Sequence, residues 1–185
     1  MAQFNSYIDA LDISAATNFC QENGVLCPYK KDDRFLQQGS VARYAALVVD
    51  GYFKFTTLNE LGDEAVINFA FPGQFITDLH SSADGGSSEM SIIAGADSKV
   101  LRVSLKSFKE VCTTSFSLEY KALFKMTLLR HLNIYRKTPQ QRYLDLCNEY
   151  PEIIKTVALK DIASFLLISP NHLSRIRRKF MIDSV

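Results

Sequence analysis

The spacing of apolar residues changes twice along the chain. Residues 4–23 carry apolar side chains every three to four positions, which is the period of an amphipathic helix. Residues 25–104 instead contain short apolar runs cut by turn residues, and these runs predict strands at 25–29, 44–49, 52–58, 64–71, 90–94 and 99–104. The helical period returns at Leu105. The pattern therefore predicts an α+β protein in which a helix, an antiparallel sandwich or roll of strands and a group of helices follow one another.

Turn residues divide the strand-like region. The pairs Asp50-Gly51 and Gly62-Asp63 lie between apolar runs, and both suit the positive φ of tight hairpins. We therefore expect hairpins at both places. The loop at residues 81–88, SSADGGSS, has two interpretations. It either links two strands or holds an anion through backbone N–H groups.

Two helices are predicted after the roll, a short one ending near Cys112 and a long one over residues 116–137. The long helix is apolar on more than one side, so more than one surface must cover it. It is either the central helix of a monomer or a helix that pairs with its copy in a second chain. The residues expected at the seam of such a homodimer are Leu118, Leu123, Leu128 and Leu132. Thr138-Pro139 ends the helix, which predicts three segments, 1–114, 115–137 and 138–185.

Residues 159–180, LKDIASFLLISPNHLSRIRRKF, form the most informative stretch. Apolar residues at Leu159, Ile162 and Leu166 predict a short helix that ends near Ile168. Ser169 is a good N-cap and Pro170 suits a first helical turn, so a second helix is predicted there. Leu173, Ile176 and Phe180 fall on one face of that helix, which is expected to pack inward.

The opposite face of the second helix carries Asn171, Arg175 and Arg178. Residues 155–180 hold six Lys or Arg side chains and one acid, Asp161, although the whole chain has a net charge of +1. Arg can donate two hydrogen bonds to guanine, and Asn can pair with adenine. Two short helices, a tight turn and this face suggest a DNA-binding helix-turn-helix. A helical hairpin with a solvated basic face is the alternative.

Composition narrows the function classes. The chain has 185 residues, of which 47% are hydrophobic and 22% charged, so a sizeable core can form. It contains neither a run long enough to cross a membrane nor the basic, apolar start of a signal peptide, and we expect a cytoplasmic protein. The four cysteines contain no CxxC pair and the three histidines are widely separated. We therefore expect no metal site, no cofactor and no catalytic residues.

The order of these elements, together with several motifs, resembles the family of the cyclic-AMP receptor protein and the fumarate–nitrate regulator. The motifs are Gly39, Asp50-Gly51, FPGQFITDL, SKVLRVS, QQRYLDLCNEYPEI and LKDIASFLLISPNHLSRIRRK. The last matches the family's helix-turn-helix without a gap. The resemblance also implies that the strands form an antiparallel β-roll of the jelly-roll type. The resemblance implies base contacts from Pro170, Asn171 and Arg175 and phosphate contacts from Ser169 and His172. The expected DNA-binding set is completed by Ser174, Arg178 and Lys179.

The cyclic-nucleotide pocket of the family is altered in this sequence. The resemblance places the pocket at Gly73, Phe75, Asp78, Leu79, Ser88 and Glu89. Members that bind cyclic nucleotides hold the phosphate with an Arg followed by Ser or Thr, where this chain has Ser88 and Glu89. A phosphate beside Glu89 would be repelled, so we expect no cyclic-AMP binding. The cysteines Cys20, Cys27 and Cys112 fall short of the four thiolates that an iron–sulfur cluster usually takes.

The resemblance implies a transcription regulator that binds double-stranded DNA as a homodimer, with RNA polymerase as a further partner and an unknown small molecule as effector. The β-hairpin wing that follows the recognition helix in many members is missing after MIDSV. Two other classes stay open. One is a sensor or adaptor that regulates a protein partner, which the missing wing and Pro170 favour. The other is a metal-dependent enzyme on a β-roll, which needs more histidines than His80 in the strands.

Overall fold

The computed structural model describes the backbone of residues 13–183 apart from residues 61, 79–80, 82–85 and 113–115. The chain forms two compact units, and the boundary between them falls between Phe124 and Lys125, inside helix α4 (Phe116–Arg136). The predicted division into 1–114, 115–137 and 138–185 is finer and stays a prediction. The predicted N-terminal helix is described from Ser14 onward as α1 (Ser14–Asn23), and its residues 4–12 lie outside the described part.

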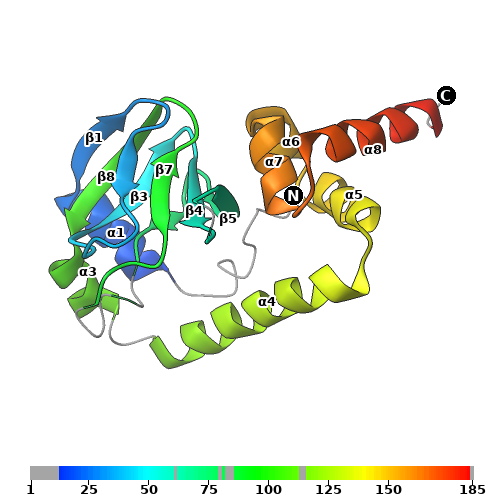
Figure 1. Ribbon diagram of the computed structural model, residues 1–185. Coiled ribbons are helices and arrows are strands. Elements are labelled where there is room, and N and C mark those ends of the chain that lie inside the picture. The colour runs from blue at the N-terminus through cyan, green and yellow to red at the C-terminus, as the bar shows by residue number, and fades with distance from the viewer. Residues whose placement is uncertain (1–12, 61, 79–80, 82–85, 113–115, 184–185) are drawn as a thin grey trace. The chain divides into compact units, whose positions relative to one another are not determined.

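The first unit is an antiparallel β-roll, as predicted (Figure 1). One sheet has the strand order β1-β8-β3-β6 and the other the order β2-β7-β4-β5. The strands are β1 (Val25–Tyr29), β2 (Arg34–Leu36), β3 (Tyr44–Asp50), β4 (Phe53–Leu58), β5 (Glu64–Ala70), β6 (Phe75–Ile76), β7 (Ser91–Ala94) and β8 (Ser98–Ser104). Each of the six predicted strands is present. The two that the pattern did not predict, β2 and β6, are the shortest.

The turn at Asp50-Gly51 is not the hairpin that the sequence suggested. Gly51 has the expected positive φ of 77°, but β3 pairs with β8 and β6, whereas β4 pairs with β5 and β7. The turn therefore carries the chain from one sheet to the other. Gly51 is required there, because an added Cβ would lie 2.2 Å from Ser98 Oγ. The second predicted turn is a hairpin, with Gly62 at φ 83° between β4 and β5.

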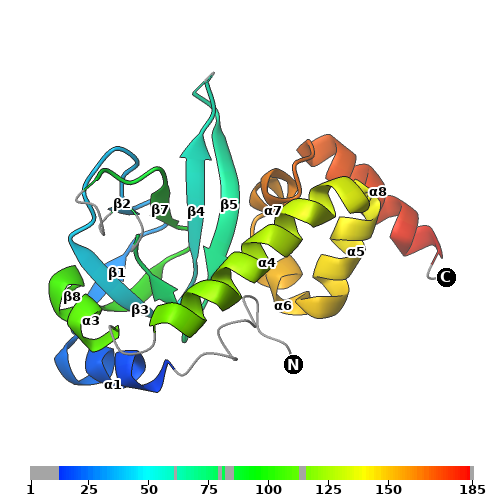
Figure 2. The same cartoon turned by 90° about the horizontal axis from the view of Figure 1, so that it is seen from below.

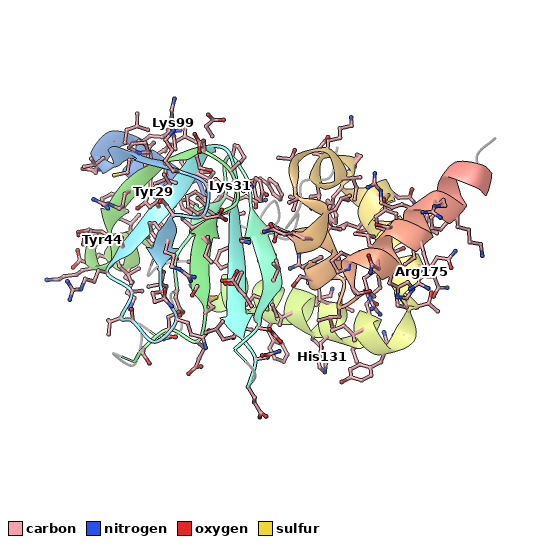
Figure 3. All side chains as sticks on the ribbon, turned by 45° about the horizontal axis from the view of Figure 1, so that its top comes forward. Tyr29, Lys31, Tyr44, Lys99, His131 and Arg175 are labelled. Atoms are coloured by element: carbon pink, nitrogen blue, oxygen red, sulfur yellow. The ribbon has the colours of Figure 1, made fainter. Side chains whose placement is uncertain are left out.

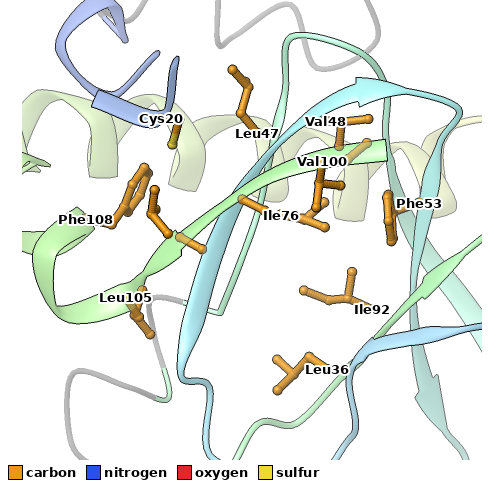
Figure 4. Close-up of a cluster of buried hydrophobic side chains, with 14 of the residues drawn as sticks. Cys20, Leu36, Leu47, Val48, Phe53, Ile76, Ile92, Val100, Leu105 and Phe108 are labelled. Atoms are coloured by element: carbon orange, nitrogen blue, oxygen red, sulfur yellow. The ribbon is translucent and has the colours of Figure 1, made fainter. Parts of the chain in front are cut away.

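The core of the roll is built from buried apolar residues of both sheets (Figure 4). It includes Leu36, Val48, Phe53, Ile76, Ile92 and Val100. Helix α1 and helix α3 (Leu105–Cys112) lie side by side at one end of the roll in both Figure 1 and Figure 2. They extend the core with Cys20, Leu105 and Phe108, and the Phe108 ring lies 5.2 Å from that of Phe75.

The second unit contains the last part of α4 and four further helices, α5 (Pro139–Glu149), α6 (Pro151–Thr156), α7 (Leu159–Phe165) and α8 (Pro170–Asp183). Its buried apolar residues are Tyr143, Leu146, Ile153, Val157, Ile162, Ala163, Leu166, Leu173 and Ile176. A capping box begins α5, because Thr138 accepts from the Gln141 backbone and the Gln141 side chain accepts from the Thr138 backbone. This capping box explains why the long helix ends before Thr138-Pro139 and a new helix begins there, as the sequence predicted. Helix α6 was not predicted.

Candidate functional site

Helices α7 and α8 are joined by a tight turn. The backbone N–H of Ile168 donates to the Ala163 carbonyl at 3.0 Å, and that of Leu167 donates to the Ser164 carbonyl at 2.9 Å. These two bonds form a Schellman motif, which normally has glycine in the left-handed position. Here that position is held by Leu167, with φ 56° and a side chain that is 58% exposed. The turn thus fixes the direction of α8 at a cost in backbone strain.

Replacing Leu167 by glycine is expected to stabilise the second unit by about 0.5–1 kcal/mol. The left-handed conformation costs a leucine about 1–2 kcal/mol, which exceeds the extra chain entropy that glycine loses on folding. Chemical denaturation followed by circular dichroism measures the difference. The control is Leu159→Gly at the start of α7, where no strain is relieved and helix propensity predicts a loss of about 1 kcal/mol. A less stable Leu167→Gly protein would contradict this explanation of the turn.

The start of α8 and its inner face agree with the sequence prediction. Ser169 Oγ accepts a hydrogen bond from the His172 backbone N–H at 3.2 Å, and Pro170 occupies the first turn. Leu173 and Ile176 are buried, and the half-buried Phe180 ring lies 6.4 Å from the ring of Tyr143. The packing of this face holds the helix in place and determines which side chains point outward.

The outer face of α8 presents the predicted DNA-binding side chains, including Arg175 (Figure 3). All of that set are exposed, namely Ser169, Pro170, Asn171, His172, Ser174, Arg175, Arg178 and Lys179. Among the residues that the structure describes, Arg175, Arg178 and Lys179 form no salt bridge. Their charges are therefore available to an anionic partner, such as a phosphate group.

Arg142 of α5 links the ends of two helices and was missed in the sequence. Its guanidinium donates to the Leu166 carbonyl at 2.9 Å, to the Lys137 carbonyl at 2.9 Å and to the Ile134 carbonyl at 3.2 Å. These carbonyls lie at the ends of α4 and α7, where helices lack internal partners. Arg142 thus fixes the α7–α8 pair relative to the end of α4. No local pattern reveals such a contact between distant residues.

The described part of α4 carries an exposed apolar stripe. Leu128 is 44% exposed, Tyr135 is 76% exposed, and the half-buried Leu132 lies between them. The His131 ring is on the same stripe, 5.2 Å from the Tyr135 ring (Figure 3). The spacing is that of a coiled-coil seam. The side chains of the other two predicted seam residues, Leu118 and Leu123, lie outside the described part of the chain.

Two residues of the predicted nucleotide pocket, Asp78 and Ser88, are joined by a hydrogen bond. Asp78 and Ser88 are buried, with 3% and 1% of their surfaces exposed. The Asp78 carboxylate accepts from the Ser88 hydroxyl at 2.5 Å, from the Ser81 hydroxyl at 2.8 Å and from the Ser81 backbone at 3.1 Å. Glu89 is exposed. These bonds satisfy the carboxylate with groups of the chain itself.

Three further residues of the predicted nucleotide pocket are Gly73, Phe75 and Leu79. Gly73 has a positive φ of 85° in the turn before β6, where it donates its N–H to the Val48 carbonyl. Phe75 packs its ring against Phe108 and so contributes to the core. Leu79 lies outside the described residues. The structure thus gives Gly73 and Phe75 structural contacts within the roll.

Two titratable groups beneath α8 are perturbed. The pKa of Tyr143 is raised to about 12, mainly by burial and in addition by the neighbouring Cys147. Arg177 acts in the opposite direction and lowers this pKa. Burial also raises the pKa of the Cys147 thiol. Both groups are therefore neutral near pH 7 and add no negative charge beneath α8.

The cysteines and histidines that the structure describes are not gathered into a metal site. Cys20 lies in α1, Cys27 in β1 and Cys147 in α5, and all three are free thiols. Within the described part of the chain, no group of three or more His, Cys, Asp or Glu side chains could hold a metal ion. None of the described helices has the length and hydrophobicity needed to cross a membrane.

Comparison with known proteins gives one family match and several matching folds. Residues 26–115 match the family model of the cyclic nucleotide-binding domain. No curated protein matches the chain by sequence. FixK2 from Bradyrhizobium japonicum is 18% identical, with 88% of this chain and 86% of that chain covered and a TM-score of 0.71.

Two other regulators have the same fold. The c-di-GMP responsive global regulator CLP from Xanthomonas campestris is 14% identical, with 94% and 93% of the two chains covered and a TM-score of 0.67. A transcriptional regulator of the CRP/FNR family from Eubacterium rectale is 17% identical, with 95% and 86% covered and a TM-score of 0.68. Residues 26–115 therefore match the cyclic nucleotide-binding domain family, and the chain as a whole has the fold of the CRP/FNR regulators, as its sequence had suggested.

Proposed function

We propose that this protein is a sequence-specific transcription regulator that binds double-stranded DNA as a homodimer. The observation that carries the proposal is the outer face of α8, where Arg175 and Asn171 are exposed on a helix whose inner face is packed. Side chains on the first turns of such a helix can reach base edges in the major groove. The proposal places the protein in the cytoplasm and assigns it no catalytic activity.

A homodimer supplies the second half of the recognition surface. Two α8 helices related by a two-fold axis would enter successive major grooves, and paired binding compensates for the modest affinity of each half-site. The exposed stripe on α4 supports this assembly, because an apolar surface of that spacing is covered when two copies pair. RNA polymerase is the expected protein partner of the regulator, and its small-molecule effector is unidentified.

Selection of bound duplexes from a random DNA pool tests the proposal. The purified full chain is expected to enrich a motif with two-fold symmetry and half-sites about one helical turn apart. A protein with Arg175, Arg178 and Lys179 replaced by alanine is the control and should enrich no motif. If the unmodified chain also enriches none, the exposed Pro170, which has no hydrogen-bond donor, would favour the adaptor that docks a protein partner.

Cyclic AMP and cyclic GMP are expected not to bind to the roll. The Asp78 carboxylate is already satisfied by Ser81 and Ser88, and the buried Ser88 stands where a phosphate-binding Arg would be needed. Titration calorimetry with either nucleotide should show no heat beyond dilution, in parallel with a cyclic-nucleotide-binding protein as the positive control. Micromolar binding of either nucleotide would overturn this interpretation.

A further inference from the structure

A groove at one end of the roll, apart from Asp78 and Ser88, has the size of a small-molecule site. It lies between α1, α3 and the ends of β1, β3 and β8, and its volume is about 570 Å³. Ligand sites typically measure about 300–1,000 Å³. None of the residues predicted for the nucleotide pocket lines this groove. It is therefore a separate surface of the same unit.

Arg102 gives the groove a fixed positive charge. Its guanidinium carbon lies 4.5 Å from the centre of the Tyr44 ring, and the Tyr29 side chain also interacts with it. Figure 3 labels both tyrosines on the roll. Stacking on an aromatic ring restricts a guanidinium while leaving its N–H edge open. Among the described residues Arg102 forms no salt bridge, so this half-buried cation has no anionic partner within the described chain.

The rest of the groove combines apolar and polar side chains and contains one acid, Glu110. Phe19, Val25 and Val111 supply apolar surface, and Val25 is 63% exposed. An apolar body would remove this surface from water, and an anionic group would pair with the Arg102 fork. Glu110 also lines the groove and would repel a ligand with several negative charges. The lining therefore favours a ligand with a single negative charge.

We propose that this groove binds a small monocarboxylate with an apolar body, whose carboxylate pairs with Arg102. The apolar body lies against Phe19, Val25 and Val111. The site does not depend on DNA binding or on the nucleotide pocket.

The test compares an acid with its neutral isostere. The full chain is titrated with 3-phenylpropionate and with 3-phenylpropionamide, and backbone amide signals are followed by NMR. The acid is expected to shift the signals of Val103, Ser107 and Val111, and to bind about tenfold or more tightly than the amide, because one charge-assisted contact is lost. Equal binding of the two probes, or no binding of either at millimolar concentration, would overturn the proposal. Shifts confined to residues 73–89 would also do so.

Variants of the protein test whether Arg102 supplies the positive charge that binds the acid. Arg102→Gln should weaken binding of the acid about tenfold or more and leave binding of the amide unchanged. Lys99→Gln is the matched control, because Lys99 is an exposed cation on the same strand that does not line the groove. Ser107→Phe on α3 narrows the groove without changing charge and should weaken both probes. Retention of the acid's affinity in Arg102→Gln, or its loss in Lys99→Gln, would refute the site.

Discussion

Replacing Arg175 by alanine is expected to cost about 1–3 kcal/mol of DNA-binding free energy per half-site and to relax the choice of base at one symmetric position. Arg175 is exposed, forms no salt bridge among the described residues and lies one turn after Asn171 on the outer face of α8. Its planar fork can donate two hydrogen bonds to guanine, which a shorter or apolar side chain cannot replace. Repeating the duplex selection with the variant shows whether the preference for one base is lost at a symmetric position of the motif.

Arg178→Ala is the matched control, since it removes the same guanidinium from the same helix one turn further on. Its contact is expected at the DNA backbone, so its loss should weaken binding to all duplexes alike. The salt dependence should then fall by about one ion per lost phosphate contact. If both variants lowered every affinity equally and relaxed no base, Arg175 would be a phosphate contact and its assignment as the base reader would be wrong.

Periodicity predicted the long elements of the fold well. The strands β1, β4 and β8 and the helix α3 begin and end within about one residue of the predicted positions. Strands β4 and β8 and helix α3 each contain two or more buried residues, and burial is what the pattern encodes. The short strands β2 and β6 were not predicted, because two or three residues are too few to show the alternation of apolar and polar side chains that marks a strand.

Pairing between strands could not be derived from the turns. Asp50-Gly51 has the local geometry of a tight turn, yet β3 and β4 belong to different sheets. A turn pair specifies φ and ψ at two residues, whereas the choice of sheet depends on strands that are far away in sequence. The partners of β3 are β6, some thirty residues later, and β8, some fifty residues later, and no residue near Gly51 indicates this.

The candidate sites show the same division between local and distant information. Exposure of Asn171 and Arg175 followed from helical spacing, because Leu173 and Ile176 fix the buried face. The sequence also indicated that Ser88 stands in place of the family's phosphate-binding Arg. The bonds that tie Asp78 to Ser81 and Ser88, and those that Arg142 makes to Leu166 and Lys137, are contacts that spacing does not specify.

Introducing aspartate at Leu128 is expected to dissociate the proposed homodimer. Leu128 lies 44% exposed on the stripe with His131, Leu132 and Tyr135, and pairing of two α4 helices would bury it. A carboxylate placed in an apolar seam without a partner costs at least about 2 kcal/mol, which weakens the dimer about 30-fold or more. Light scattering at micromolar concentration should give about twice the chain mass for the unmodified protein and a lower mass for Leu128→Asp.

Asn133→Asp provides the matched control, because it adds the same charge to α4 on the side opposite the stripe. The near-identical size of the two side chains preserves the packing, so this variant should keep the mass of the unmodified protein. A lower mass for both variants would mean that added charge alone weakens the dimer. If the unmodified chain had the mass of a monomer, the prediction that α4 forms a dimer interface would be wrong. The proposed regulator would then also lose the paired binding on which its DNA affinity depends.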